Sequence, residues 1–125
     1  FSYHLAVVVD DAQQKISHII RGSDLYQQTP QQVWLQACLD YKQPRYGHLP
    51  IIINGQGQKL SKQNLATPLD MLQAPALMSE ALERLGHPAP CGLRQAPVAE
   101  QLEWAAGQWD IECVPKRMQD PIAFV

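Results

Sequence analysis

The first half of the chain alternates continuous apolar runs with short polar turns. The run over residues 3–9 is rich in β-branched side chains and ends at two aspartates, and such a continuous run is typical of a central strand covered on both faces. Residues 16–20 predict a second, short strand. Residues 49–53 predict a buried third strand that leads into Asn54 and Gly55, a dipeptide typical of a tight hairpin turn.

Helical spacing of apolar residues appears in three further segments. Thr29 is expected to be the N-cap of a helix over residues 30–40, which has proline in its first turn. A second helix is expected over residues 76–85, with Gly86 as its stop, and a third over residues 98–109. This order of elements predicts an α/β fold with a C-terminal helical appendix. The tryptophans on these helical faces are expected to pack in the core: Trp34, Trp104 and Trp109.

Composition narrows the class of protein. The chain has 125 residues, which fits one domain of ordinary size, and its 46% hydrophobic residues contain no apolar run of eighteen. We therefore expect no membrane partner, and the use of cysteine favours a reducing cytoplasm. The cysteines at positions 38, 91 and 113 are far apart and odd in number, so neither a disulfide framework nor a closed metal site is predicted.

Charge is distributed unevenly along the chain, although the formal net charge is only −2. Residues 12–69 contain six basic and two acidic side chains, which gives +4, whereas residues 70–125 contain four basic and eight acidic ones, which gives −4. An anionic ligand would be attracted to the first part. Such asymmetry also arises by chance in small domains. Local motifs are therefore needed to show whether an anionic ligand binds in the first part.

The clearest local motif is the sequence KLSKQ at residues 59–63, directly after the expected hairpin turn. Lys59 and Lys62 lie three positions apart around Ser61. Two ammonium groups and a hydroxyl suit a triphosphate, because they can balance the charge that builds on the leaving phosphates. The alternative is an ordinary solvated hairpin tip.

A second motif lies at the end of the second predicted strand, where α/β sheets usually place ligand sites. The planar guanidinium of Arg21 suits a small carboxylate, which it can bind with two hydrogen bonds. The alternative is a surface ion pair between Arg21 and Asp24. Residue type alone favours a core-packed role for Tyr3, and His48 is expected to be structural or exposed.

Four stretches taken together resemble one enzyme family: YHLAVVVDD at 3–11, ISHIIRGSDL at 16–25, TPQQVWL at 29–35 and HLPIIINGQGQKLSKQN at 48–64. They are similar to the second half of the Rossmann-type catalytic domain of glutamyl-type class I aminoacyl-tRNA synthetases. The resemblance implies that residues 1–72 form the C-terminal half of a nucleotide-binding catalytic domain and that residues 73–125 form a helical region. The KLSKQN sequence and the short helical ending resemble a short branch of the family that modifies tRNA(Asp).

The resemblance also implies roles for individual residues. Residues 59–63 match the KMSKS-type loop, with Leu in place of Met and Gln in place of the final Ser. Lys59 and Lys62 would then be catalytic, and Ser61 and Lys62 would contact ATP. Tyr3 and Arg21 match the family's glutamate-binding tyrosine and arginine.

The implied reaction is the activation of glutamate by ATP, with Mg²⁺, to give glutamyl-adenylate and pyrophosphate. Glutamate would then pass to the queuosine base of tRNA(Asp), so the implied partners are glutamate, ATP and tRNA(Asp) carrying queuosine. Val7 supports this branch, because ordinary glutamyl enzymes tend to carry asparagine at that position.

Other parts of the family's site have no match in these residues. They are the HIGH-type motif, the first strand and helix, and the zinc insertion, whose ligands are therefore not in this chain. We expect them upstream of Phe1, and we expect this chain alone to be inactive and to self-associate through exposed strand edges. Two alternatives stay open: a fragment of an ordinary glutamyl-tRNA synthetase, and a non-catalytic binding module derived from the half-fold.

Overall fold

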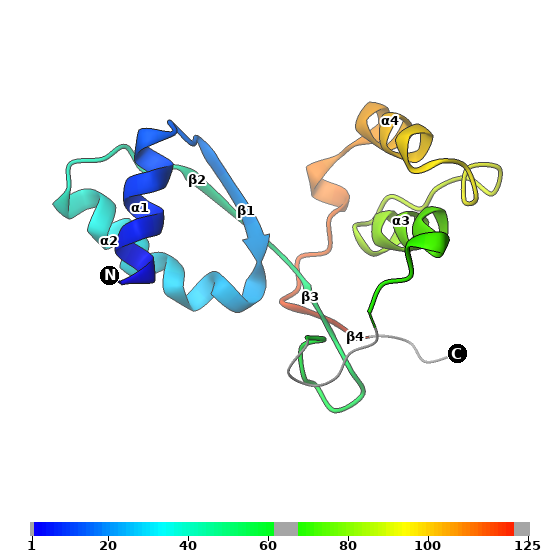
Figure 1. Cartoon of the computed structure of the whole chain (residues 1–125), viewed down its shortest axis with the longest axis horizontal. Coiled ribbons are helices and arrows are strands. Elements are labelled where there is room, and N and C mark those ends of the chain that lie inside the picture. Colours follow the sequence, from blue (N-terminus) through cyan, green and yellow to red (C-terminus); the bar gives the residue numbers. More distant parts are fainter. Residues whose placement is uncertain (1, 62–67, 122–125) are drawn as a thin grey trace. The chain divides into compact units, whose positions relative to one another are not determined.

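The structure is a computed structural model that describes residues 2–61 and 68–121 (Figure 1). The chain divides into two compact units, Phe1–Ile51 and Ile52–Val125. Lys62 and Gln63 of the predicted ATP loop lie outside the described residues. The predicted boundary at residue 72 concerns a larger catalytic domain and stays a prediction.

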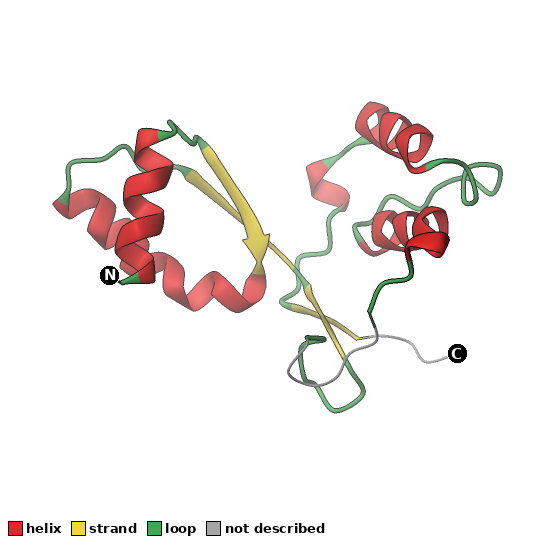
Figure 2. Ribbon diagram, viewed as in Figure 1, coloured by secondary structure: helices red, strands yellow, loops and turns green. Residues whose placement is uncertain are grey.

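The first unit is built around a pair of parallel strands. Helix α1 (Tyr3–Gln13) precedes strand β1 (His18–Gly22), and helix α2 (Thr29–Cys38) leads to strand β2 (Arg45–Leu49). A 3-10 helix over residues 23–28 connects β1 to α2. Strands β1 and β2 pair with His18 opposite Arg45 and Gly22 opposite Leu49 (Figure 2). A helix that joins two parallel strands is the unit from which α/β folds are built, so the predicted fold class is confirmed here.

The prediction of a strand over residues 3–9 is wrong, because these residues form the first part of α1. Val8 is buried, and all of the half-buried positions except Val9 follow helical spacing around it: His4, Val7, Asp11 and Ala12. Helix α1 packs against α2, and burial of this stripe outweighs the weak strand preference of the three valines. The core position expected for Tyr3 is also wrong, since its side chain is 55% exposed.

Helix α2 confirms the predicted helix, but two of its details differ. Gln28 rather than Thr29 precedes the helix, and no side chain caps it. The Thr29 hydroxyl instead bonds to side chains of the two strands. Trp34 is 66% exposed, so it does not pack in the core, and it lines a shallow hollow of about 440 Å³ together with Pro30 and His4.

The predicted strand over residues 49–53 is divided between two strands. Strand β2 ends at Leu49, and β3 (Ile51–Ile53) begins after Pro50, which cannot donate a ladder hydrogen bond. Strand β3 continues into the second unit, where it pairs with β4 (Gln119–Pro121). The expected hairpin is confirmed, because the Leu60 amide donates to the Ile52 carbonyl at 2.9 Å. Its loop differs from the expected tight Asn54–Gly55 turn: the Asn54 amide donates to the Gln58 carbonyl at 2.9 Å, so the loop covers residues 55–57, with φ +76° at Gly57.

The rest of the second unit contains helices α3 (Ala74–Arg84) and α4 (Val98–Gln108), which pack against each other. Both helices and the loop between them confirm the sequence prediction. A single turn of 3-10 helix precedes α3, and another follows α4. The buried apolar side chains of this unit come from both helices and from the segments that follow them: Leu82, Ala89, Ala105 and Val114.

Gly86 ends α3 with φ +81°, a left-handed conformation that glycine adopts readily. A Cβ at this position would clash with the backbone carbonyl oxygen of Cys113. Replacing Gly86 by alanine is therefore expected to lower the free energy of unfolding by about 2 kcal/mol, as measured by chemical denaturation.

Gly107→Ala is the matched control for this prediction. Gly107 lies near the end of α4, and a Cβ there would have nothing within 4 Å. Alanine should stabilise this helix by about 0.5–1 kcal/mol. Equal effects of the two substitutions would contradict the role of Gly86 as the close-approach position.

Candidate functional site

Arg21 is the next-to-last residue of β1, at the carboxyl end of the parallel strands. Its guanidinium is held by three hydrogen bonds. Nη1 donates to Oε1 of Gln32 at 2.7 Å, and Nη2 donates to Oγ1 of Thr29 at 2.8 Å. Nε donates to Nε2 of His48 at 3.3 Å, and the guanidinium carbon lies 5.1 Å from the ring centroid of Tyr46. Both strands and α2 therefore fix the direction of this side chain.

The groups that hold Arg21 are an amide, a hydroxyl, an imidazole and an aromatic ring, and all of them are uncharged. Within the described part of the chain, the guanidinium has no carboxylate partner, so the alternative of an ion pair with Asp24 is not supported. An arginine has five N–H donors, and three of them are used here, which leaves one on each terminal nitrogen. A half-buried, fixed cation of this kind suits an anionic ligand.

His48 takes part in the network as a neutral ring. Because an arginine nitrogen can only donate, Nε2 of His48 must accept, and the ring proton lies on Nδ1. Burial lowers the pKa of His48, and the positive charge of Arg21 lowers it further. The expectation of a structural histidine is confirmed, although its contact with Arg21 was not foreseen. Register explains this contact, because β1 and β2 pair with Arg21 opposite His48.

The structure connects Tyr3 to this network through its neighbour. Nε2 of Gln32 donates to Nδ1 of His4 at 3.4 Å, and the rings of His4 and Tyr3 meet edge to face with centroids 5.3 Å apart. The hydrogen bonds described here include His4 but not the Tyr3 hydroxyl. The structure therefore brings the first turn of α1 to the Arg21 network and leaves the Tyr3 ring largely exposed.

The residues predicted to contact ATP belong to the second unit. Lys59 forms an antiparallel bridge with Ile53, and its side chain is exposed. Asn54 fixes the turn that precedes it, because its side-chain oxygen accepts from the amides of Gln56 at 3.0 Å and Gln58 at 2.9 Å. Ser61, which follows, is half-buried. The structure thus presents the first lysine of the motif at the base of a hairpin.

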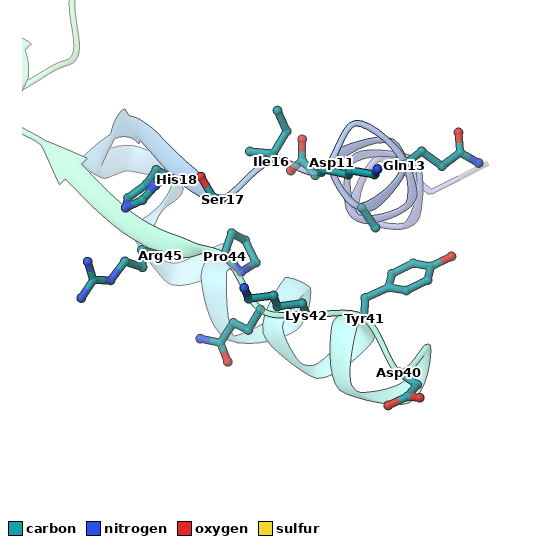
Figure 3. Close-up of a pocket in the computed structure, with 13 residues that line it drawn as sticks. Asp11, Gln13, Ile16, Ser17, His18, Asp40, Tyr41, Lys42, Pro44 and Arg45 are labelled. Atoms are coloured by element: carbon teal, nitrogen blue, oxygen red, sulfur yellow. Dashed lines mark hydrogen bonds between the residues drawn. The ribbon is translucent and has the colours of Figure 1, made fainter.

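A cleft of about 690 Å³ lies at the opposite end of the strands from Arg21, about 10 Å away for the three residue steps from Arg21 to His18 (Figure 3). Its walls come from the last residues of α1, the first residues of β1 and β2, and the two loops that precede these strands. Three cations, Lys15, Lys42 and Arg45, line it together with two carboxylates. The carbonyl ends of both helices also point there, so the charges largely balance. The Arg21 network is therefore the better anion site.

The described residues also bear on metal binding, disulfides and membrane spans. Residues 2–61 and 68–121 contain no group of three or more His, Cys, Asp or Glu side chains that could hold a metal ion. The cysteines at 38, 91 and 113 are all free and exposed. None of the helices described is long and apolar enough to cross a membrane.

Solved structures confirm the fold. A glutamate tRNA ligase from Elizabethkingia meningosepticum, crystallised in complex with its amino acid, matches 98% of this chain and 28% of its own with a TM-score of 0.66 and 20% identity. A glutamate-tRNA synthetase from Elizabethkingia anophelis matches the same shares with a TM-score of 0.68. At this identity the similarity establishes the fold alone.

Sequence relatives are much more similar. A protein named glutamyl-Q tRNA(Asp) synthetase from a Synechococcus species is 56% identical over 84% of this chain. A protein of the same name from Thiobacillus denitrificans is 50% identical over 92% of this chain. The chain spans 35% and 38% of the lengths of these two relatives. Residues 2–90 match the family described as tRNA synthetases class I (E and Q), catalytic domain. The resemblance found in the sequence is thereby confirmed, and the chain belongs to this family of class I tRNA synthetases.

Proposed function

We propose that the protein containing this chain activates glutamate with ATP and transfers it to the queuosine base of tRNA(Asp). The observation that carries the proposal is the half-buried guanidinium of Arg21, which neutral groups hold in a fixed direction at the carboxyl end of β1. Amino-acid activation needs a site that binds a small carboxylate, and this cation is suited to one.

In this proposal the two units have different tasks. Arg21 binds a carboxylate of glutamate, and Tyr3 contacts the same amino acid from the first turn of α1. Lys59, Ser61 and Lys62 would contact the phosphates of ATP, which would enter as its Mg²⁺ complex, and the two lysines would balance charge on the phosphates. A carboxylate oxygen of glutamate attacks the α-phosphate, the bond to the β-phosphate bridging oxygen breaks, and pyrophosphate leaves. The remaining groups of the site come from outside these 125 residues.

The choice of RNA acceptor rests on the relatives. Both proteins compared above have names that specify tRNA(Asp), and they are 50% or more identical to this chain. Val7, in place of the asparagine of ordinary glutamyl enzymes, supports the same branch. The first test of the proposal is ATP–pyrophosphate exchange by the full-length protein. Exchange should depend on glutamate, and neither aspartate nor glutamine should replace it.

Replacing Arg21 by lysine is expected to raise the KM for glutamate about tenfold and to leave the KM for ATP nearly unchanged. An ammonium cannot keep three hydrogen bonds in one plane and also present two further donors to a carboxylate. Both constants can be measured in the exchange assay of the full-length protein.

Arg45→Lys is the matched control for this substitution. Arg45 is the first residue of the neighbouring strand, its side chain is exposed, and it lies at the other end of the sheet. We expect both KM values of this variant to match those of the parent. A change in the KM for ATP alone on Arg21→Lys would show that Arg21 does not bind the amino-acid carboxylate.

A further inference from the structure

A buried amide group lies directly behind Arg21. The side chain of Gln32, on α2, is 1% exposed, and its oxygen makes the shortest hydrogen bond to the guanidinium, at 2.7 Å. The proposed function assigns no role to this residue. On the basis of that function, we propose that Gln32 is a positioning residue that aims Arg21 at the glutamate carboxylate and couples Arg21 to the first turn of α1.

Chemistry fixes the orientation of this amide. Because Arg21 can only donate, the atom that faces it must be Oε1, so Nε2 faces His4. Nδ1 of His4 must then accept, which places the proton of the neutral ring on Nε2. His4 in turn contacts the ring of Tyr3. One buried amide therefore connects the two residues that are proposed to contact glutamate.

The neutrality of Gln32 is as important as its position. A carboxylate in its place could accept the same hydrogen bond from Nη1, but it would also neutralise the guanidinium. The charge that attracts a ligand would then be satisfied inside the protein. A glutamine supplies the acceptor and the fixed direction without this compensation. The amide thus keeps Arg21 available for an anion from outside.

Gln36 offers a comparison within the same helix. It lies one turn after Gln32, is 3% exposed, and donates from Nε2 to the hydroxyl of Tyr46 at 2.8 Å. Its Oε1 is buried and has no partner among the described residues. Gln36 does not bond to Arg21, so it matches Gln32 in residue type, helix and burial but not in the proposed role.

The test compares Gln32→Leu, Gln32→Glu and Gln36→Leu in the full-length protein. Gln32→Leu should raise the KM for glutamate about fivefold through the loss of one hydrogen bond to Arg21. Gln32→Glu keeps the acceptor but adds charge, so it should raise the KM for glutamate at least as much while the thermal midpoint stays near that of the parent. In both variants the KM for ATP should change little. Gln36→Leu removes a buried oxygen without a partner and the hydrogen bond to the Tyr46 hydroxyl, but it leaves all three hydrogen bonds of Arg21 in place, so it should raise the KM for glutamate much less than Gln32→Leu does and leave the KM for ATP unchanged.

Two results would overturn the inference. The first is an equal effect of Gln32→Leu and Gln36→Leu on the KM for glutamate, which would indicate a general role in packing. The second is an unchanged KM for glutamate in Gln32→Glu, which would show that added charge beside Arg21 does not matter.

The Arg21→Lys variant separates the positioning role of Gln32 from the proposed glutamate site at Arg21. If Arg21→Lys raises the KM for glutamate and neither Gln32 variant does, the proposed function stands and the positioning role fails. If Arg21→Lys also has no effect, the glutamate site itself is misplaced.

Discussion

Replacing Lys62 by alanine in the full-length protein is expected to lower the rate of glutamate-dependent ATP–pyrophosphate exchange about 100-fold. This is the usual scale for the loss of one preorganised charge that stabilises a transition state. The expectation rests on the KLSKQ motif, whose first lysine the structure presents at the base of a hairpin. Binding of glutamate should change little, because Arg21 and Tyr3 are the residues proposed to contact it. Exchange at saturating glutamate measures the effect.

Lys116→Ala serves as the control for this substitution. Lys116 belongs to the same unit, is 75% exposed and pairs with Glu112 at 2.6 Å. Removal of such a surface pair should leave the exchange rate unchanged. An exchange rate of Lys62→Ala within about threefold of the parent would contradict the assignment of this loop to the triphosphate.

The parts of the fold that the sequence predicted well have local signals. Gly86 ends α3, and Asn54 forms the hairpin turn, because each adopts or stabilises a backbone conformation that few other residues can. Helix α1 was mispredicted because three consecutive valines favour a strand locally, whereas the helical stripe around Val8 is buried only when α2 is present. Strand β4 has three residues, which is too short for a periodic pattern.

The site likewise combines a residue that its own sequence neighbourhood identifies with partners that only the fold brings close to it. Arg21 could be proposed from its position after a strand, but its partners could not. Thr29 has the sequence features of a helix N-cap, but its hydroxyl accepts a hydrogen bond from Arg21. This contact depends on how β1 and α2 pack together, which the sequence does not show. His48 lies 27 residues from Arg21, and only the parallel register brings them together. Tyr3 and Lys62 stay predictions, since no contact described here tests them.

The last prediction concerns the RNA acceptor. Queuosine carries a cyclopentene diol on a base in the anticodon loop, and bases in loops can leave the stack and enter a protein site. A hydroxyl of the diol could then attack the glutamyl-adenylate carbonyl, with AMP as the leaving group. We expect the full-length protein to attach radiolabelled glutamate to queuosine-containing tRNA(Asp). Binding should weaken as salt increases, because the +4 segment over residues 12–69 would supply part of the phosphate contacts.

Chemical treatment of the RNA gives this prediction an all-or-none readout. Periodate cleaves vicinal diols, so treated tRNA(Asp) should no longer accept glutamate. Since periodate also destroys the ribose diol at the 3′ end, tRNA(Asp) without queuosine is the necessary control, and it should accept no glutamate even when its 3′ end is intact. tRNA(Glu) should likewise stay uncharged. Stable attachment of glutamate to the 3′ end of tRNA(Glu), with none on tRNA(Asp), would instead identify the protein as an ordinary glutamyl-tRNA synthetase. The roles proposed for Arg21 and Gln32 would survive that result, because they concern the amino acid and not the RNA.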